Sequence, residues 1–148
     1  MYLSHLQLNS FRSFANEQVS FQSGLTVLVG ENNGGKSNII DAIRLVSTPL
    51  SGRRDLYCEQ TDIRFGATPS IFELRATFSE LSPPQQGRLL SATTDDTLQE
   101  ACFGLTYDAS SHQAHIRPTL WAGRFKAAPE PGCHEMIRHV YLPPLRDA

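Results

Sequence analysis

Long apolar stretches are missing from this sequence, and their absence excludes one class of protein. The longest, residues 25–29 with Thr26 inside it, is far shorter than the ~20 residues that cross a bilayer. The first five residues lack the basic start and the apolar run of a signal peptide. We therefore expect a soluble, cytoplasmic protein with no membrane partner.

Cysteine and net positive charge are also scarce. The three cysteines, at positions 58, 102 and 133, are an odd number with long gaps and no CxxC pair, so neither a disulfide framework nor a zinc knuckle is expected. Thirteen basic residues against fifteen acidic ones argue against strong nucleic-acid binding by this segment alone. The 148 residues are 40% hydrophobic, which is typical of one globular domain and excludes a disordered chain.

The first 50 residues predict strands, a glycine loop and a helix. Tyr2, Leu6 and Leu8 alternate in one expected strand, and Val19 and Phe21 in a second. Residues 25–29 form a nearly continuous apolar run, which favours a central parallel strand covered on both faces. Helical spacing of apolar residues then begins near residue 39 and stops before Pro49.

The remaining residues, 51–148, predict a mixed and β-rich part of the same domain. Alternating or β-branched segments favour strands at residues 71–78, 102–107, 115–121 and 136–142. Residues 82–98 have moderate helix potential, and residues 123–132, with two prolines, are expected to form a loop. The fold class expected from these patterns is α/β.

The most informative motif is GENNGGKS at residues 30–37, which matches the phosphate-loop pattern GxxxxGK[ST] at every fixed position. Gly34 and Gly35 would let the backbone approach phosphates, and Lys36 would reach the β- and γ-phosphates. Ser37 would offer its hydroxyl to Mg²⁺. The expected cofactors are ATP and Mg²⁺; the structural alternative is a glycine-rich turn that caps an ordinary helix.

Residues 8–14, 24–38 and 40–43 resemble the start of the SMC/RecF type of ABC ATPase. The run Asn32-Asn33-Gly34-Gly35-Lys36, with residues 141–147, is more similar to the OLD (overcoming lysogenization defect) family of ATP-dependent nucleases. The resemblance implies a P-loop NTPase fold, the ABC-type head lobe with N-terminal antiparallel β-hairpin elements. It also implies ATP-dependent homodimerisation of two heads, and DNA as a partner of the full-length parent.

The same resemblance implies further nucleotide-binding residues. Arg12 and Ser13 stand where the family's N-terminal hairpin loop approaches the nucleotide, so Arg12 is a candidate phosphate ligand, with an exposed loop arginine as the alternative. Asn32 and Asn38 match positions that flank the loop, and each could orient the γ-phosphate or cap the helix. Asn33 lies within the loop itself.

Two parts of an ABC catalytic site are missing from the sequence. No apolar strand ends in Asp-Glu, and the nearest approach, residues 103–108, is interrupted by Gly104 and Thr106. The family signature is also absent; residues 50–54 imitate its first letters but directly follow the expected helix. There, Arg53 and Arg54 are candidates for phosphate or DNA contact, against the alternative of a solvated turn.

Other reactive residues carry little weight. His112 and His115 have HxxH spacing without further metal ligands nearby, so surface histidines are the favoured interpretation. Cys133 and His134 could suggest a nucleophile and its base, but adjacent side chains rarely face one another productively. No metal or cysteine chemistry is expected from them.

The leading hypothesis is therefore an ATP- and Mg²⁺-binding N-terminal lobe of a larger DNA-processing ATPase, inactive by itself, with an OLD-like nuclease as the favoured parent. Any nuclease chemistry would lie in a C-terminal Toprim domain outside this sequence. A non-catalytic nucleotide-sensing dimerisation module is the main alternative. A P-loop kinase for a small molecule is a weaker one, because a hairpin unit precedes the loop strand.

Overall fold

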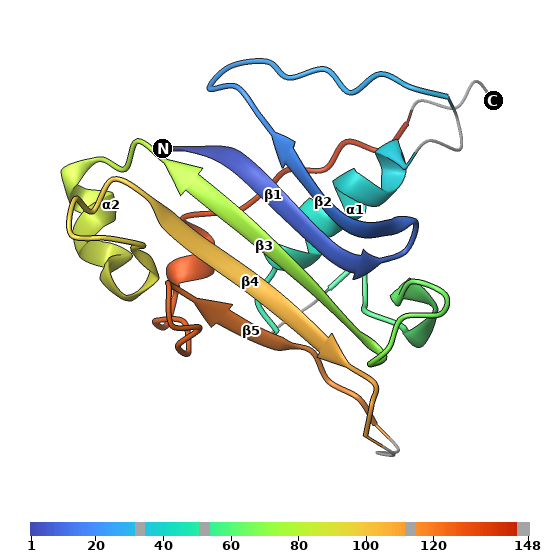
Figure 1. Cartoon of the computed structure of the whole chain (residues 1–148). Coiled ribbons are helices and arrows are strands. Elements are labelled where there is room, and N and C mark those ends of the chain that lie inside the picture. The colour runs from blue at the N-terminus through green and yellow to red at the C-terminus, as the bar shows by residue number, and fades with distance from the viewer. Residues whose placement is uncertain (32–34, 51–53, 112–114, 145–148) are drawn as a thin grey trace.

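The computed structural model describes residues 1–31, 35–50, 54–111 and 115–144. Five strands form one antiparallel sheet in the order β2-β1-β3-β4-β5 (Figure 1). Helix α1 (Lys36–Val46) lies across one face of this sheet, and the short helix α2 (Pro83–Arg88) lies at one end. Three single turns of 3₁₀ helix complete the regular structure of the described residues: η1 (Gln60–Asp62), η2 (Leu90–Ala92) and η3 (Cys133–Glu135).

Strands β1 (Tyr2–Phe11) and β2 (Phe14–Ser20) form the predicted hairpin, with Phe11 paired to Phe14 next to the turn. The turn is tighter than the sequence indicated, because only two residues separate the strands and Arg12 adopts a positive φ of 51°. One face of β1 is buried, as its alternation predicted. The tight turn fixes Arg12 and Ser13 beside the start of α1.

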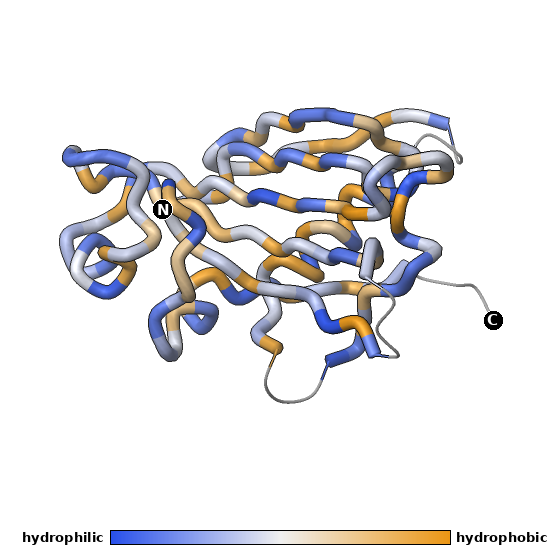
Figure 2. Tube along the Cα trace, turned by 60° about the horizontal axis from the view of Figure 1, so that its bottom comes forward, coloured by the Kyte–Doolittle hydropathy of each residue, from blue (hydrophilic) through white to orange (hydrophobic). Residues whose placement is uncertain are grey.

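Strand β3 (Ile71–Ser79) occupies the centre of the sheet, between β1 and β4 (Ala101–Asp108). Its alternate residues Phe72, Leu74, Ala76 and Phe78 are buried, which confirms the prediction from their spacing. In Figure 2, hydrophobic and hydrophilic positions alternate along the strands in the same way. Strand β5 (Thr119–Ala122) pairs with β4 and is shorter than the predicted segment 115–121.

The core lies between α1 and the sheet. The helix contributes Ala42, Leu45 and Val46, all almost fully buried, which confirms the predicted helix and its apolar face. The largest fully buried side chains of the sheet are Leu6, Leu8, Phe11, Phe72, Leu74, Phe103 and Leu105. The predicted helix potential of residues 82–98 is realised only as α2 and the η2 turn.

Two predicted strands are wrong. Residues 25–29 lie outside the sheet in an extended segment, with Leu25, Val27 and Val29 exposed by 86%, 69% and 88% (Figure 1). Residues 136–142 also form no strand, and Val140 and Leu142 are exposed. Apolar sequence alone does not make a strand, because the backbone N–H and C=O groups need a neighbouring strand. The five-stranded sheet of the described residues offers them none.

No helix among the described residues combines the length and the apolar character needed to span a membrane.

Candidate phosphate-binding site

The start of α1 has a backbone geometry that demands glycine. Gly35 precedes the helix with φ 90° and ψ 5°, in the left-handed region that residues with a Cβ rarely adopt. A Cβ at this position would also lie 2.7 Å from the Phe14 ring of β2. The hairpin and the glycine therefore define together how the chain enters α1.

The first turn of α1 fits an anion. It carries no acidic residue, and no side chain of the described residues caps the helix start. The amide groups of a first helical turn lack helical acceptors, and the helix dipole favours negative charge there. Lys36 and Ser37 line an adjoining cavity of about 600 Å³, which the half-buried Thr26 and Leu28 and residues 139–142 also border. The predicted loop residues Asn32, Asn33 and Gly34 lie outside the described residues.

The ammonium group of Lys36 contacts the first residue of the motif. Its Nζ donates a hydrogen bond of 2.6 Å to the carbonyl oxygen of Gly30, the first residue of the motif. This contact joins the two ends of the glycine loop. A carbonyl oxygen is a weaker partner for an ammonium group than a phosphate oxygen, because the phosphate carries charge. The lysine is therefore placed at the loop but is available to a charged ligand.

Arg12 makes a different set of contacts from the one expected. Its Nε lies 2.9 Å from Oδ1 of Asp62, and its Nη1 lies 2.6 Å from Oδ2 of Asp41. Burial lowers the Arg12 pKa, but hydrogen bonds and charge from these two carboxylates raise it above its ordinary value. The guanidinium thus joins the hairpin turn to α1 and η1, and direct contact with a phosphate stays a prediction.

Asn38 connects the same elements. Its Oδ1 accepts a hydrogen bond of 3.0 Å from Arg12, and its Nδ2 donates one of 3.3 Å to Oγ of Ser13. The structure therefore brings Arg12, Ser13 and Asn38 together, next to Lys36 and Ser37 on the first turn of α1. The amide of Asn38 contacts the hairpin turn and does not cap the helix, which was one of its two expected roles.

Sequence reasoning missed Asp41 and Asp62 as partners of Arg12. Asp41 lies three residues after Asn38, so the two share one face of α1, and that spacing was a usable signal. Asp62 is 50 residues from Arg12 in the chain and is brought in by η1. Its backbone carbonyl also accepts the Arg12 N–H at 2.7 Å. No local sequence pattern predicts a contact between two residues that far apart in the chain.

The minor candidates do not form catalytic or metal sites among the described residues. Cys133 Sγ lies 3.4 Å from Nδ1 of His134, but both residues are buried and burial raises the pKa of the thiol. Burial also raises the pKa of Cys102, and that of Cys58 to about 12. All three thiols are free, as predicted. The described residues contain no group of three or more potential metal ligands, and His112 lies outside them.

The family is decided by comparison with known proteins. The model of the AAA domain family matches residues 5–98, which is more than half of the chain and includes the glycine loop, the hairpin and α1. The chain belongs to this AAA domain family. The match covers Arg12, Asn38 and both carboxylates that hold Arg12.

Curated relatives of this AAA domain protein include three bacterial proteins named DNA replication and repair protein RecF. The protein from Microcystis aeruginosa is 48% identical over 63 residues, which are 40% of this chain and 17% of the relative. The protein from Synechocystis sp. is 45% identical over 83 residues, which are 55% of this chain and 22% of the relative. The protein from Paenarthrobacter aurescens is 38% identical over 82 residues, which are 55% of this chain and 20% of the relative. The chain thus spans 17% to 22% of the length of these relatives.

Two solved structures share the fold of this AAA domain. One, from work on ATP-driven dimerization and DNA-stimulated activation of SMC ATPases, has a TM-score of 0.59 at 21% identity and covers 93% of this chain and 75% of that one. The other, a structure of the recombination mediator RecF with ATP, has a TM-score of 0.52 at 19% identity and covers 87% of this chain and 29% of that one. The fold is therefore that of an SMC/RecF-type ABC ATPase head lobe, an α/β P-loop ATPase with antiparallel hairpin elements.

Proposed function

We propose that this chain is the ATP- and Mg²⁺-binding lobe of an ABC-type ATPase that works in DNA repair or processing. The single observation that carries the proposal is the entry into α1. There a glycine with φ 90° directly precedes Lys36 and Ser37, in a motif that matches the phosphate-loop pattern. The fold shared with SMC and RecF proteins, and the RecF relatives, support it.

Each residue of the loop has a distinct role in this proposal. Backbone N–H groups at the start of α1 hold the phosphate oxygens, and Gly34 and Gly35 keep Cβ atoms away from them. The Lys36 ammonium leaves Gly30 and binds the β- and γ-phosphates, where its charge is better compensated. Asn32 and Asn38, which match family positions that flank the loop, would orient the γ-phosphate, and Asn33 would lie within the loop around the phosphates.

The residues of this chain suit Mg²⁺ in part. Mg²⁺ keeps several waters and binds through few protein oxygens plus substrate phosphates, and Ser37 offers one hydroxyl beside the cavity. Bound Mg²⁺ would neutralise phosphate charge. The sequence contains no apolar strand ending in Asp-Glu, so this chain does not supply the Asp carboxylate that would join Ser37 on such an ion. We therefore expect nucleotide binding without turnover by this chain alone.

For Arg12 the proposal has a specific requirement. A phosphate contact through Nε or Nη1 would require the guanidinium to leave Asp62 or Asp41, because those two atoms already hold the carboxylates. Its Nη2 is the donor that could reach a phosphate while those pairs persist, since a guanidinium presents five N–H groups. Ser13 would then approach the nucleotide from the same turn.

ATP-dependent pairing of two heads and action on DNA are proposals for the whole protein. The solved SMC structure comes from work on ATP-driven dimerization and DNA-stimulated activation, and those properties belong to that ATPase. The narrower parentage, an OLD-like ATP-dependent nuclease, rests only on the NNGGKS form of the loop and on residues 141–147. The RecF relatives favour a repair ATPase as the broader statement.

A nucleotide-sensing dimerisation module is the second candidate, and the missing Asp-Glu strand favours it. It shares the loop and the bound nucleotide with the first and differs in turnover. Full-length protein that binds ATP and dimerises but does not hydrolyse ATP would select the sensor. The SMC and RecF structures favour an ABC-type head over the small-molecule kinase.

The test is calorimetric titration of MgATP into the chain and two lysine variants. Lys36→Ala should lose at least tenfold in affinity with an unchanged circular dichroism spectrum, because the lysine balances phosphate charge. Lys126→Ala is the matched control, since Lys126 is the only other lysine and pairs with Glu73 on the sheet. Equal ATP affinity of the wild type and Lys36→Ala would overturn the proposal.

A further inference from the structure

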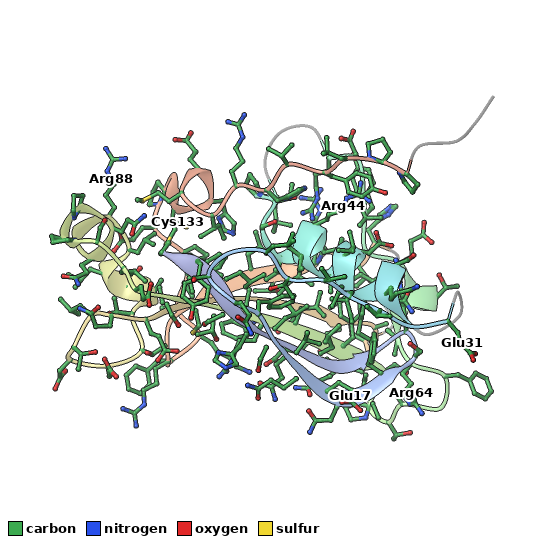
Figure 3. The ribbon with its side chains drawn as sticks, turned by 90° about the horizontal axis from the view of Figure 1, so that it is seen from above. Glu17, Glu31, Arg44, Arg64, Arg88 and Cys133 are labelled. Atoms are coloured by element: carbon green, nitrogen blue, oxygen red, sulfur yellow. The ribbon has the colours of Figure 1, made fainter. Side chains whose placement is uncertain are left out.

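A second cavity, of about 770 Å³, lies beside the C-terminal half of α1. Lys36 and Ser37, which line the first cavity, stand at the opposite end of this helix. Its basic lining residues are Arg44, Arg54, Arg138, His134 and His139, and we call it the basic cavity. Asp55 and Glu135 also border it, and both are exposed. Figure 3 shows Arg44 on α1, at the side where the segment after η3 passes the helix.

Arg54 is the unusual residue of this cavity. It is 8% exposed, yet it forms no ion pair with any described carboxylate. Its guanidinium reaches only two backbone carbonyls, those of Leu56 and Leu45, each at 3.4 Å. Burial lowers the pKa of Arg54, and no carboxylate is among the groups that act against that shift. A buried cation without an anion is costly, because burial removes most of its hydration.

The other basic groups of the cavity respond to the positive charge around them. His134 is also buried, and its pKa is lowered by burial and then by the charge of Arg54. The pKa of His139 is lowered by burial and then by the charge of Arg44. Arg44 is partly compensated, since it lies 3.3 Å from Asp41 and stacks 3.9 Å from the centre of the Tyr141 ring. The carbonyl end of α1 compensates Arg54 in part through Leu45.

We propose that the basic cavity binds a phosphate group, and that its size suits a phosphodiester of a nucleic-acid strand. Arginine is the side chain best matched to phosphate oxygens, through its planar fork of donors. Arg54 would contact the anion from within, and the exposed Arg138 from the rim. A cavity of about 770 Å³ leaves room for sugar atoms on both sides of one phosphate. Free phosphate shares the same chemistry and is the other possible source.

This site is separate from the proposed nucleotide site, although Arg44, His139 and Tyr141 border both cavities. The inference therefore does not depend on ATP binding. The Lys36→Ala chain, in which the glycine loop is disabled, is the background for the test. Oligonucleotide affinity in that background should equal that of the wild type.

The experiment measures fluorescence anisotropy of a labelled 12-nucleotide single strand at low salt, with inorganic phosphate as competitor. Arg138→Gln should weaken binding roughly fivefold to tenfold, because it removes one charged phosphate contact without touching the core. Arg54→Gln should weaken it more, and its circular dichroism spectrum must match the parent. Arg88→Gln is the matched control, an exposed arginine on α2 at the far end of the molecule (Figure 3).

A second readout locates the anion. Inorganic phosphate should shift the ring resonances of His134 and raise its titration midpoint in the NMR spectrum. A shift that the oligonucleotide does not compete away would identify free phosphate as the ligand. Affinities unchanged in Arg138→Gln and Arg54→Gln, together with an unmoved His134 ring, would overturn the inference. Equal losses in Arg138→Gln and Arg88→Gln would also overturn it, since they indicate diffuse surface attraction.

Discussion

Nη1 of Arg12 lies 2.6 Å from Oδ2 of Asp41, so an arginine in the hairpin turn is bound to the middle of the helix that follows the glycine loop. The second carboxylate, Asp62, is 9% exposed at its side chain and depends on the same guanidinium. Removal of Arg12 would leave this carboxylate buried without a cation. The ion pairs of Arg12 therefore stabilise the fold of the lobe, in addition to any role of Arg12 in nucleotide binding.

We expect Arg12→Ala to lower the free energy of unfolding by about 2–3 kcal/mol, because hydrogen bonds to charged groups are lost and Asp62 is left unpaired. Urea denaturation followed by circular dichroism measures this change. Arg88→Ala is the control, and as an exposed substitution it should change stability by no more than ~0.5 kcal/mol. Equal stability of the two variants would mean that the Arg12 ion pairs contribute nothing.

Gly104 of β4 should tolerate no side chain. An added Cβ would lie 2.0 Å from the Trp121 ring on β5, and that ring is flanked by Arg75 and Lys126 at 5.0 and 5.1 Å. We expect Gly104→Ala to destabilise the fold by about 1–3 kcal/mol, the usual cost of overpacking, measured by thermal unfolding. Gly87→Ala in α2 is the opposite case. Nothing lies within 4 Å of its Cβ position, so helix propensity should raise stability by up to ~1 kcal/mol.

Stability should fall as the pH is lowered from 7.5 to 5.5. The pKa values of His134 and His139 lie below their ordinary 6.5, mainly because burial removes hydration from both rings. The unfolded chain therefore binds more protons below pH 6.5, and folding loses free energy until the folded pKa values are passed. Urea titrations at several pH values measure the slope. His139→Gln should reduce this slope, and a slope equal to that of the wild type would contradict the assignment.

Local pattern was enough to predict much of the lobe. Strand β1, helix α1 and the central strand β3 follow from periodic spacing within one segment, whereas β2 ends at Ser20, before Phe21 of the second expected strand. Residues 25–29 have an equally clear strand composition, but a strand exists only with a neighbour. Pairing is a property of distant segments, so the apolar run could not reveal that its neighbour is missing from the described sheet.

The candidate site divides in the same way. Lys36, Ser37 and Gly35 are consecutive, and their motif specified both the helix start and the backbone that precedes it. The partners of Arg12 come from α1 and from η1, which folding alone brings together. Arg54 is a further residue whose surroundings the local sequence did not predict. A solvated turn was the alternative to phosphate or DNA contact for Arg53 and Arg54; Arg54 is buried, which excludes that alternative for it, and Arg53 lies outside the described residues.

The exposed leucine and valines at positions 25, 27 and 29 have a practical consequence for any laboratory that purifies this chain. An extended segment with exposed apolar side chains and backbone groups outside the sheet can pair with the same segment of another molecule. Self-association should therefore increase with concentration. Light scattering against protein concentration belongs before any affinity measurement, because aggregates would hide the glycine loop that starts at the very next residue.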